Sequence, residues 1–286
     1  MNNGKKKAGW ILFGVLVVVI LLILMFPVAA MISVSLKKAN DVFTMPVTWV
    51  PKVFAFENYV EVFRKMHIVN GFKASVIITS MTIILIMVIA IPAAYAFSNL
   101  NFYFKKQLYY LVLVSQMFAP VIVIIPLYSM MNKMGLIDNW LSLVLMNTTF
   151  NLAFIVLMLK ATFDSVPKEV VEAAKIDGAS DTRVMFSIVI PLLKPIIVFT
   201  IVQSSIGMFN LFTEPFILTN SSWTGGVNNG GLTLMMYLLN KAPQGGNSYG
   251  YASACAYVIT IMIVIISVFV NKFSEEKDEG RRKYGK

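Results

Sequence analysis

A row of polar side chains interrupts an apolar stretch late in the chain, and its residue types suit contact with a polar ligand. The row comprises Thr200, Gln203, Gly207, Asn210 and Glu214. Spacings of three or four residues place all five on one face of a helix whose other positions are apolar. Amides and a carboxylate exchange hydrogen bonds with the hydroxyl groups of a ligand. The aromatic residues near enough to stack on the apolar face of such a ligand are Phe209, Phe212 and Trp223.

The same row fits a second interpretation, in which its side chains hydrogen-bond to neighbouring helices and Gly207 allows close backbone approach. Both interpretations turn Glu214 away from lipid, because a carboxylate at the centre of a membrane costs about 2.5 to 3.5 kcal/mol. Similar polar residues occur in earlier apolar stretches, where Asn147 and Asn151 stand one helical turn apart. The candidate residues of a substrate path are Gln203, Asn210, Glu214, Asn151 and Gln116.

A polar stretch between two long apolar runs, residues 172–179, suits a contact with another protein. We expect a short helix that begins near Ser165 and Pro167 and ends at Gly178, since glycine adopts the left-handed conformation without steric cost. Ser180 then suits the start of a second helix. The product is a short helix, a sharp turn and a re-entry into the apolar region. The alternative is an ordinary amphipathic connector between two helices.

The elements that carry these residues are predicted to be membrane helices. Apolar residues make up 58% of the 286 residues and charged residues only 13%, a balance typical of a membrane protein that crosses the bilayer several times. Six segments reach the roughly 20 residues that a spanning helix needs, and strands with open edges are excluded there. They are residues 10–34, 74–97, 108–131, 140–159, 188–218 and 251–270. We therefore expect an all-α membrane protein, with helices kinked at Pro92, Pro120, Pro126 and Pro215.

The distribution of basic residues predicts the orientation. With both termini in the cytoplasm, about two thirds of the 24 Lys and Arg residues lie on the cytoplasmic side. This places a loop at residues 164–190 in the cytoplasm and loops at residues 35–73 and 219–250 outside. The net charge of +10 then reflects topology, and the basic C-terminal tail suits lipid headgroups rather than nucleic acid.

No catalytic motif is visible in the sequence. The single cysteine, Cys255, lies in an apolar run, and no phosphate-binding loop of the form Gly-x-x-x-x-Gly-Lys or zinc-ligand spacing occurs. We therefore expect no enzymatic activity, no metal and no cofactor in this chain.

The polar stretch nevertheless resembles the signature loop of a known family. Glu172-Ala173-Ala174 is followed by Gly178 after three residues and by Ile188-x-x-Pro191 after nine more. This pattern resembles the permease subunits of binding-protein-dependent ABC importers, although Ile190 stands where the family usually has Leu. Residues 125–128, Ile-Pro-Leu-Tyr, are similar to the carbohydrate branch, the maltose and multiple-sugar permeases.

The resemblance implies one permease domain over residues 1–286, with the type I ABC importer permease fold and six transmembrane helices. In that family the loop is the coupling helix, which docks on an ATPase; the matching residues are Glu172, Ala173, Ala174, Asp177, Gly178 and Ala179. It also implies a bacterial cell membrane and several partners: a second, related permease in a heterodimer rather than a homodimer, two ATPase subunits that hold ATP and Mg, and an external sugar-binding protein.

Other functions stay open on the sequence. The first is an ABC importer permease for a solute other than sugar. An ion-coupled secondary transporter is a second. Such transporters usually need several ionisable residues within the membrane, however, and here only Glu214 stands out, with no visible inverted repeat. A membrane enzyme is a third, without a visible nucleophile, base or metal cluster.

Overall fold

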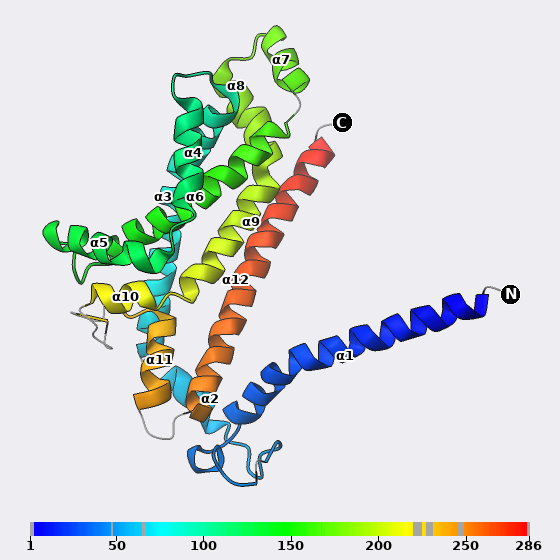
Figure 1. Ribbon diagram of the computed structural model, residues 1–286, viewed down its shortest axis with the longest axis vertical. Helices are drawn as coiled ribbons and strands as arrows, with labels where there is room; N and C mark the ends of the chain where they lie inside the picture. The colour runs from blue at the N-terminus through cyan, green and yellow to red at the C-terminus, as the bar shows by residue number, and fades with distance from the viewer. Residues whose placement is uncertain are drawn as a thin grey trace. The chain divides into compact units, whose positions relative to one another are not determined.

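The computed structural model describes residues 3–46, 48–64, 67–166, 168–219, 225–226, 231–244 and 249–284. Throughout these ranges the chain forms helices and turns, and no strand occurs in them (Figure 1). The predicted all-helical class is confirmed.

Five helices in the described ranges are long and apolar enough to cross a membrane. They are α1 (Asn3–Ser35), α3 (His67–Asn99), α6 (Trp140–Asp164), α9 (Ile190–Phe209) and α12 (Tyr249–Tyr284). A sixth span results if the bent pair α4 (Lys105–Ser115) and α5 (Pro120–Lys133) is counted as one. The shorter helices are α2 (Glu57–Arg64), α7 (Lys168–Ile176), α8 (Asp181–Val184), α10 (Thr213–Leu218) and α11 (Leu234–Gln244). A 3-10 turn (Ala39–Asp41) and a π-helical turn (Met185–Val189) complete them.

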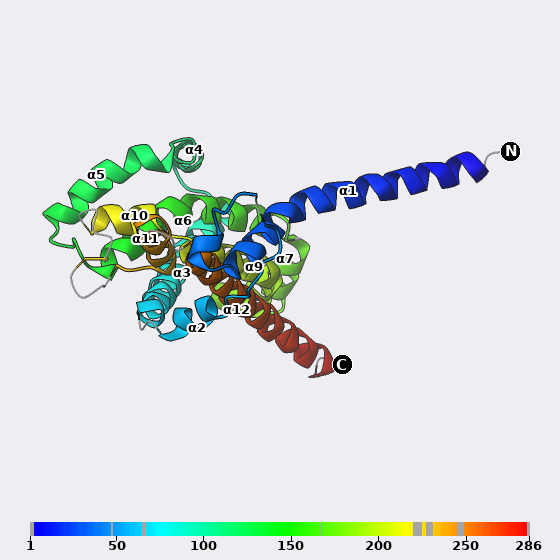
Figure 2. The same cartoon turned by 90° about the horizontal axis from the view of Figure 1, so that it is seen from below.

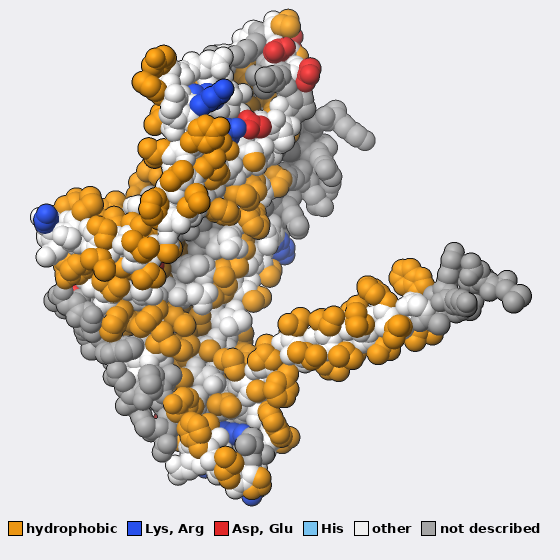
Figure 3. Space-filling view, in the orientation of Figure 1, with side chains coloured by type: hydrophobic (Ala, Val, Ile, Leu, Met, Phe, Trp, Pro, Cys, Tyr) orange, Lys and Arg blue, Asp and Glu red, His pale blue; other side chains and the backbone are white. Residues whose placement is uncertain are grey.

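The chain divides into two compact units, Met1–Met66 with Leu238–Val258, and His67–Tyr237 with Ile259–Lys286. In the first unit, Asn58 joins the end of α1 to α2, because its Nδ2 donates to the carbonyl oxygens of Ser35 (2.8 Å) and Lys37 (3.0 Å). The start of α12 approaches the same place. A Cβ on Gly250 would lie 2.6 Å from the Lys37 oxygen, so only glycine fits there. Hydrophobic side chains stay exposed along α1 (Figure 3).

The second unit is built on three helices that pack side by side, α3, α6 and α9. Small residues let α3 approach its neighbours closely, since Ala90 and Ala94, one turn apart, are both fully buried. They share a core with Leu159 of α6 and Leu193 of α9. At one end of this packing the chain passes from α6 through α7 and α8 into α9 (Figure 1).

Two of the predicted spans are broken rather than continuous. The span expected at residues 108–131 is divided into α4 and α5, which are bent by 102° (Figure 2). Pro120 opens α5, and Ala119 before it is extended (φ −63°, ψ 130°), because the proline ring disfavours the helical conformation in the preceding residue. In contrast, α3 continues as one helix through Pro92, and α5 through Pro126.

The span expected at residues 188–218 ends at Phe209, and the chain resumes as α10 at Thr213. Pro215 explains the break, because it has no N–H for the carbonyl four residues earlier and its ring clashes with that carbonyl. This carbonyl belongs to Leu211, and the buried Thr233 donates its hydroxyl to it at 2.6 Å. A residue from a distant segment thus satisfies the carbonyl that Pro215 leaves without a helical partner.

Replacing Thr233 therefore tests the packing around the break. Thr233→Val keeps the shape but leaves the buried Leu211 carbonyl without its donor, which costs about 1 to 3 kcal/mol. Thr233→Ser keeps the hydroxyl and is the matched control. We expect thermal denaturation of the purified protein to show a lower midpoint for the valine variant than for the serine variant. Equal midpoints would contradict this role for Thr233.

Candidate functional site

The polar stretch at residues 172–179 forms the predicted helix and turn. Gly178 has a left-handed backbone (φ 83°) and ends α7. Beyond it the chain folds back, and the N–H of Ala179 donates to the Ala174 carbonyl at 3.0 Å. This six-residue bond is the pattern that closes a helix at a left-handed glycine. The predicted stop at Gly178 is confirmed.

The two serines that flank this segment have different roles. Ser180 accepts a bond from the Arg183 N–H at 3.3 Å and caps α8, as predicted. α7 begins at Lys168, close to the predicted start near Ser165, but Ser165 itself ends α6 and donates its hydroxyl to the Thr162 carbonyl at 2.7 Å rather than capping α7. Pro167 lies outside the described residues.

The side chains of α7 and its turn face two ways. Ala174 and Ala179 pack against the core that α3, α6 and α9 share. On the other side, Glu172, Ala173, Ile176 and Asp177 are exposed, and we name these four residues the outer face of α7. Ile176 is 86% exposed. Sequence reasoning did not single out Ile176, although an apolar residue within a polar stretch was the available signal.

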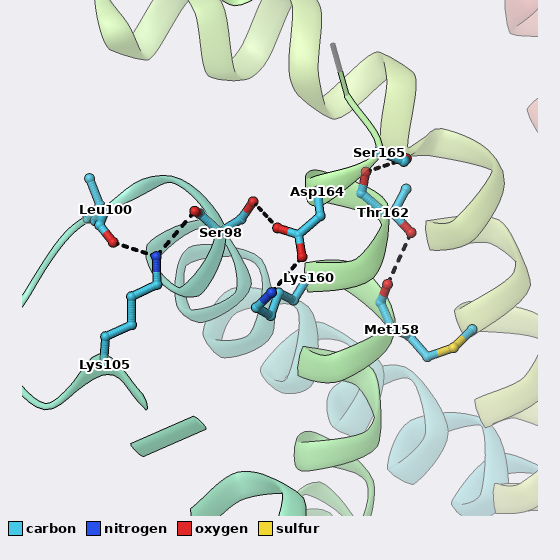
Figure 4. Close-up of polar contacts among 8 residues, drawn as sticks. All are labelled: Ser98, Leu100, Lys105, Met158, Lys160, Thr162, Asp164 and Ser165. Carbon is cyan, nitrogen blue, oxygen red and sulfur yellow. Dashed lines mark hydrogen bonds and ion pairs between the residues drawn. The ribbon is translucent and has the colours of Figure 1, made fainter. Parts of the chain in front are cut away.

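A polar network holds the end of α6 from which this segment departs (Figure 4). Asp164 accepts a bond from the Ser98 hydroxyl at 2.6 Å and pairs with Lys160 at 2.5 Å. Lys105, at the start of α4, donates to the carbonyls of Leu100 (2.8 Å) and Ser98 (3.3 Å). These bonds connect the end of α3 to the end of α6 and to the start of α4. The position of the α6 end, after which the chain continues into α7, is therefore fixed.

A cavity of about 320 Å³ lies in the second unit between α6, α9 and α10, with Pro120 of α5 at its wall. Its volume is at the lower end of the range of ligand pockets. Phe150 and Phe154 contribute aromatic surface. The polar lining consists of Asn147, Asn151, Thr200, Gln203, Ser204 and Glu214.

The structure brings together most of the candidate path residues. Gln203, Glu214 and Asn151 line the cavity, as do Thr200 and Gly207 of the predicted row. Asn210 and Gln116 are not part of the lining.

Asn210 is the residue after α9, and its Nδ2 donates to the Ile206 carbonyl at 2.8 Å. Gln116 is the residue after α4, at the bend before α5. Both side chains are exposed.

The hydrogen bonds of three lining residues run within their own helices. The amides of Asn147 and Asn151 donate to carbonyls one turn earlier, at 2.8 and 2.9 Å, and Thr200 does the same at 2.8 Å. An amide has two donor hydrogens and an acceptor oxygen, so Asn147 and Asn151 can still donate to and accept from a ligand, whereas the Thr200 hydroxyl can only accept. These bonds favour a lining role over interhelical bonding for the three residues.

The aromatic lining differs from the sequence expectation. Phe209 is 1% exposed in the core rather than in the cavity, and Phe212 stacks on Phe216 with ring centres 5.4 Å apart. Trp223 lies outside the described residues. Phe150 and Phe154 replace them. The sequence did contain a signal for Phe150 and Phe154, because both stand three residues after an asparagine of the same helix, Asn147 or Asn151.

Metal and thiol chemistry have no visible place in the part of the chain described. No cluster of three His, Cys, Asp or Glu residues there is arranged to hold a metal ion, and Cys255 is buried.

A helical membrane protein with an exposed turn and a polar cavity is the class that these features define. The family model of the "binding-protein-dependent transport system inner membrane component" matches residues 86–275. The chain therefore belongs to this family of transport permeases.

The chain is similar in sequence to several transport system permease proteins. The chain is 30% identical over 175 residues to the sulfoquinovosyl glycerol transport system permease protein of Agrobacterium fabrum, an alignment that spans 60% of each chain, less than two thirds of that relative's length. It is 29% identical to the diacetylchitobiose uptake system permease protein of Streptomyces coelicolor, over 90% of this chain and 84% of the relative. It is also 29% identical to the trehalose transport system permease protein of Mycobacterium tuberculosis, over 92% of each chain.

Solved structures share the fold. A chain of a bacterial ABC transporter involved in the import of the acidic polysaccharide alginate matches with a TM-score of 0.77, over 96% of this chain and 98% of that chain. A chain of a bacterial alginate ABC transporter in complex with a periplasmic protein matches with a TM-score of 0.63. Sequence identity is 19% and 16%, so the likeness extends to the fold alone.

The network at the end of α6 yields a prediction about stability. Asp164→Asn and Ser98→Ala should each lower the free energy of unfolding by less than about 1 kcal/mol, because the Asp164 side chain is 46% exposed and solvent screens the pair. The effect of Asp164→Asn should shrink in high salt. Lys160→Met, which removes the same ion pair but keeps the Ser98 bond, is the matched control. Thermal denaturation at low and high salt measures all three, and a loss that salt does not reduce would contradict the account.

Proposed function

We propose that this chain is a transmembrane subunit of an ATP-driven importer of sugars or oligosaccharides in the bacterial cell membrane. The observation that carries the proposal is the exposed outer face of α7 on a turn closed by Gly178, in a chain of this permease family. The relatives named for trehalose and diacetylchitobiose transport support the sugar class.

The proposed assembly contains this chain as a single permease domain and a second, related permease. Two cytoplasmic ATPase subunits hold ATP and Mg, this chain itself carries no cofactor, and an external binding protein delivers the sugar. We assign six spans, with α4 and α5 counted as one, both termini in the cytoplasm, and the type I importer fold. The solved alginate importer chain, whose TM-score is 0.77, supports that fold.

In this proposal, closure of the ATPases moves α7 and the movement reaches the cavity. The outer face of α7 docks on the ATPase, while Ala174 and Ala179 are packed against the core of α3, α6 and α9. Two of these helices, α6 and α9, supply most of the cavity lining. Rigid helices packed in this way carry a displacement from one end to the other.

The substrate path runs through the cavity in this proposal. Asn151, Gln203 and Glu214 exchange hydrogen bonds with sugar hydroxyls, and Phe150 and Phe154 face the apolar side of the ring. Asn210 and Gln116 lie beyond the lining and are assigned no direct contact in the conformation described here.

A substitution on the outer face of α7 tests the proposal. Ile176→Ser removes an exposed apolar side chain, so the permease itself should still fold, with its denaturation midpoint unchanged. If Ile176 anchors α7 in the ATPase, sugar uptake should fall about tenfold or more, which is the effect of losing an interface hot spot.

Met45→Ser is the matched control, because Met45 is 88% exposed on the loop after α1 and is assigned no docking role. Uptake and ATP hydrolysis are measured for both variants in reconstituted complexes at equal membrane levels. Normal uptake by the Ile176 variant would remove Ile176 from the coupling contact. Normal uptake by a further variant, Ala173→Trp, would remove the outer face as a whole.

A further inference from the structure

The cavity of the second unit contains charge of only one sign. Glu214, in the first turn of α10, is the ionisable residue among those that line it, and none of the described lining residues is Lys, Arg or His. Its side chain is partly buried. The other polar groups of the lining are neutral amides and hydroxyls.

The basic residues of α6 and α9 lie outside the cavity, at least one helical turn from its nearest lining residue. On α9, Lys194 precedes Thr200 by six residues, about 9 Å along the helix axis. On α6, Lys160 follows the last lining residue, Ile155, by five residues, about 7.5 Å along the axis, and pairs with Asp164. The carboxylate therefore sets the potential in the cavity, and low-dielectric walls strengthen it.

We propose that Glu214 makes the cavity selective by charge, so that it admits neutral and amine-bearing sugars and excludes anionic sugars such as uronates. This inference rests on the proposed transport path. The solved importer with the same fold is involved in the import of an acidic polysaccharide, so the fold by itself does not restrict transport to neutral sugars. Glu214 is then a specificity-determining residue of this chain.

A single thiol in the cavity measures the charge preference without knowledge of the natural sugar. Cys255 is the one cysteine of the sequence, so Cys255→Ala leaves this chain without thiols, and labelling is read on this chain after it is separated from the other subunits. Gly207→Cys then adds a reporter to the cavity wall, where a Cβ meets no atom within 4 Å. The reporter is treated with a cationic (trimethylammonium) and an anionic (sulfonate) methanethiosulfonate of similar size. Met45→Cys, on an exposed loop, gives the intrinsic ratio of the two rates.

The Gly207→Cys thiol should favour the cationic reagent about tenfold or more over the ratio at Met45→Cys, as expected for a cleft of one charge sign. Glu214→Gln should bring the ratio to that of the Met45→Cys control. Glu214→Asp, which keeps the charge, should retain the preference. All variants are labelled in the assembled complex, with and without ATP, and complex yield is recorded for each.

The outcomes separate the inference from the proposed function. A rate ratio at Gly207→Cys equal to that at Met45→Cys, or a cation preference that survives Glu214→Gln, would overturn the charge role of Glu214 and leave the path in place. A thiol that reacts with neither reagent in any nucleotide state would show that solutes do not reach the cavity, and would overturn both.

Discussion

The close packing of α3 against α6 is the contact on which the second unit depends. Ala90 and Ala94 are fully buried in it, and a larger side chain at either position would force the two helices apart. Because α9 joins the same core through Leu193, the cavity between α6 and α9 inherits its geometry from this contact. Ala174 of α7 and Ala179 of the turn after it both pack against this core. The exposed turn and the cavity are thus joined by packed side chains rather than by a free loop.

Local features of this arrangement were predictable from the sequence. Gly178 ends α7 and Ser180 caps α8 because both effects depend only on residues within one helical turn. Ser165 shows the limit of such reasoning. A serine hydroxyl accepts at the start of a helix or donates back at its end, and here it donates back to Thr162. Choosing between these roles requires knowledge of where α6 ends.

Features that depend on tertiary contacts were less predictable. The spacing of Thr200, Gln203 and Gly207 placed them correctly on one face, but the break that Pro215 imposes put Asn210 beyond the end of α9. The sequence contained a signal for this break, because Pro215 has no N–H to bond the carbonyl of Leu211, four residues earlier. The donor to the Leu211 carbonyl, Thr233, lies in a distant segment and could not be identified from the local sequence pattern.

Side-chain direction on α6 and α7 likewise follows from packing. Phe150 and Phe154 line the cavity, whereas Val156 and Leu159 of the same helix are buried in the core that α6 shares with α3 and α9. Likewise Ile176 is exposed, whereas Ala174 packs against that core. Helical periodicity relates these residues to one another, but it does not say which face meets the core.

ATP-dependent sugar uptake by the assembled complex is tested most directly by one measurement. Proteoliposomes that contain the purified complex, with the native binding protein outside, are loaded with ATP and Mg, and entry of the sugar that the binding protein captures is followed with and without a protonophore. We expect uptake that requires internal ATP and continues when the proton gradient is collapsed. Uptake that persists without ATP and stops with the protonophore would contradict it and would identify an ion-coupled transporter.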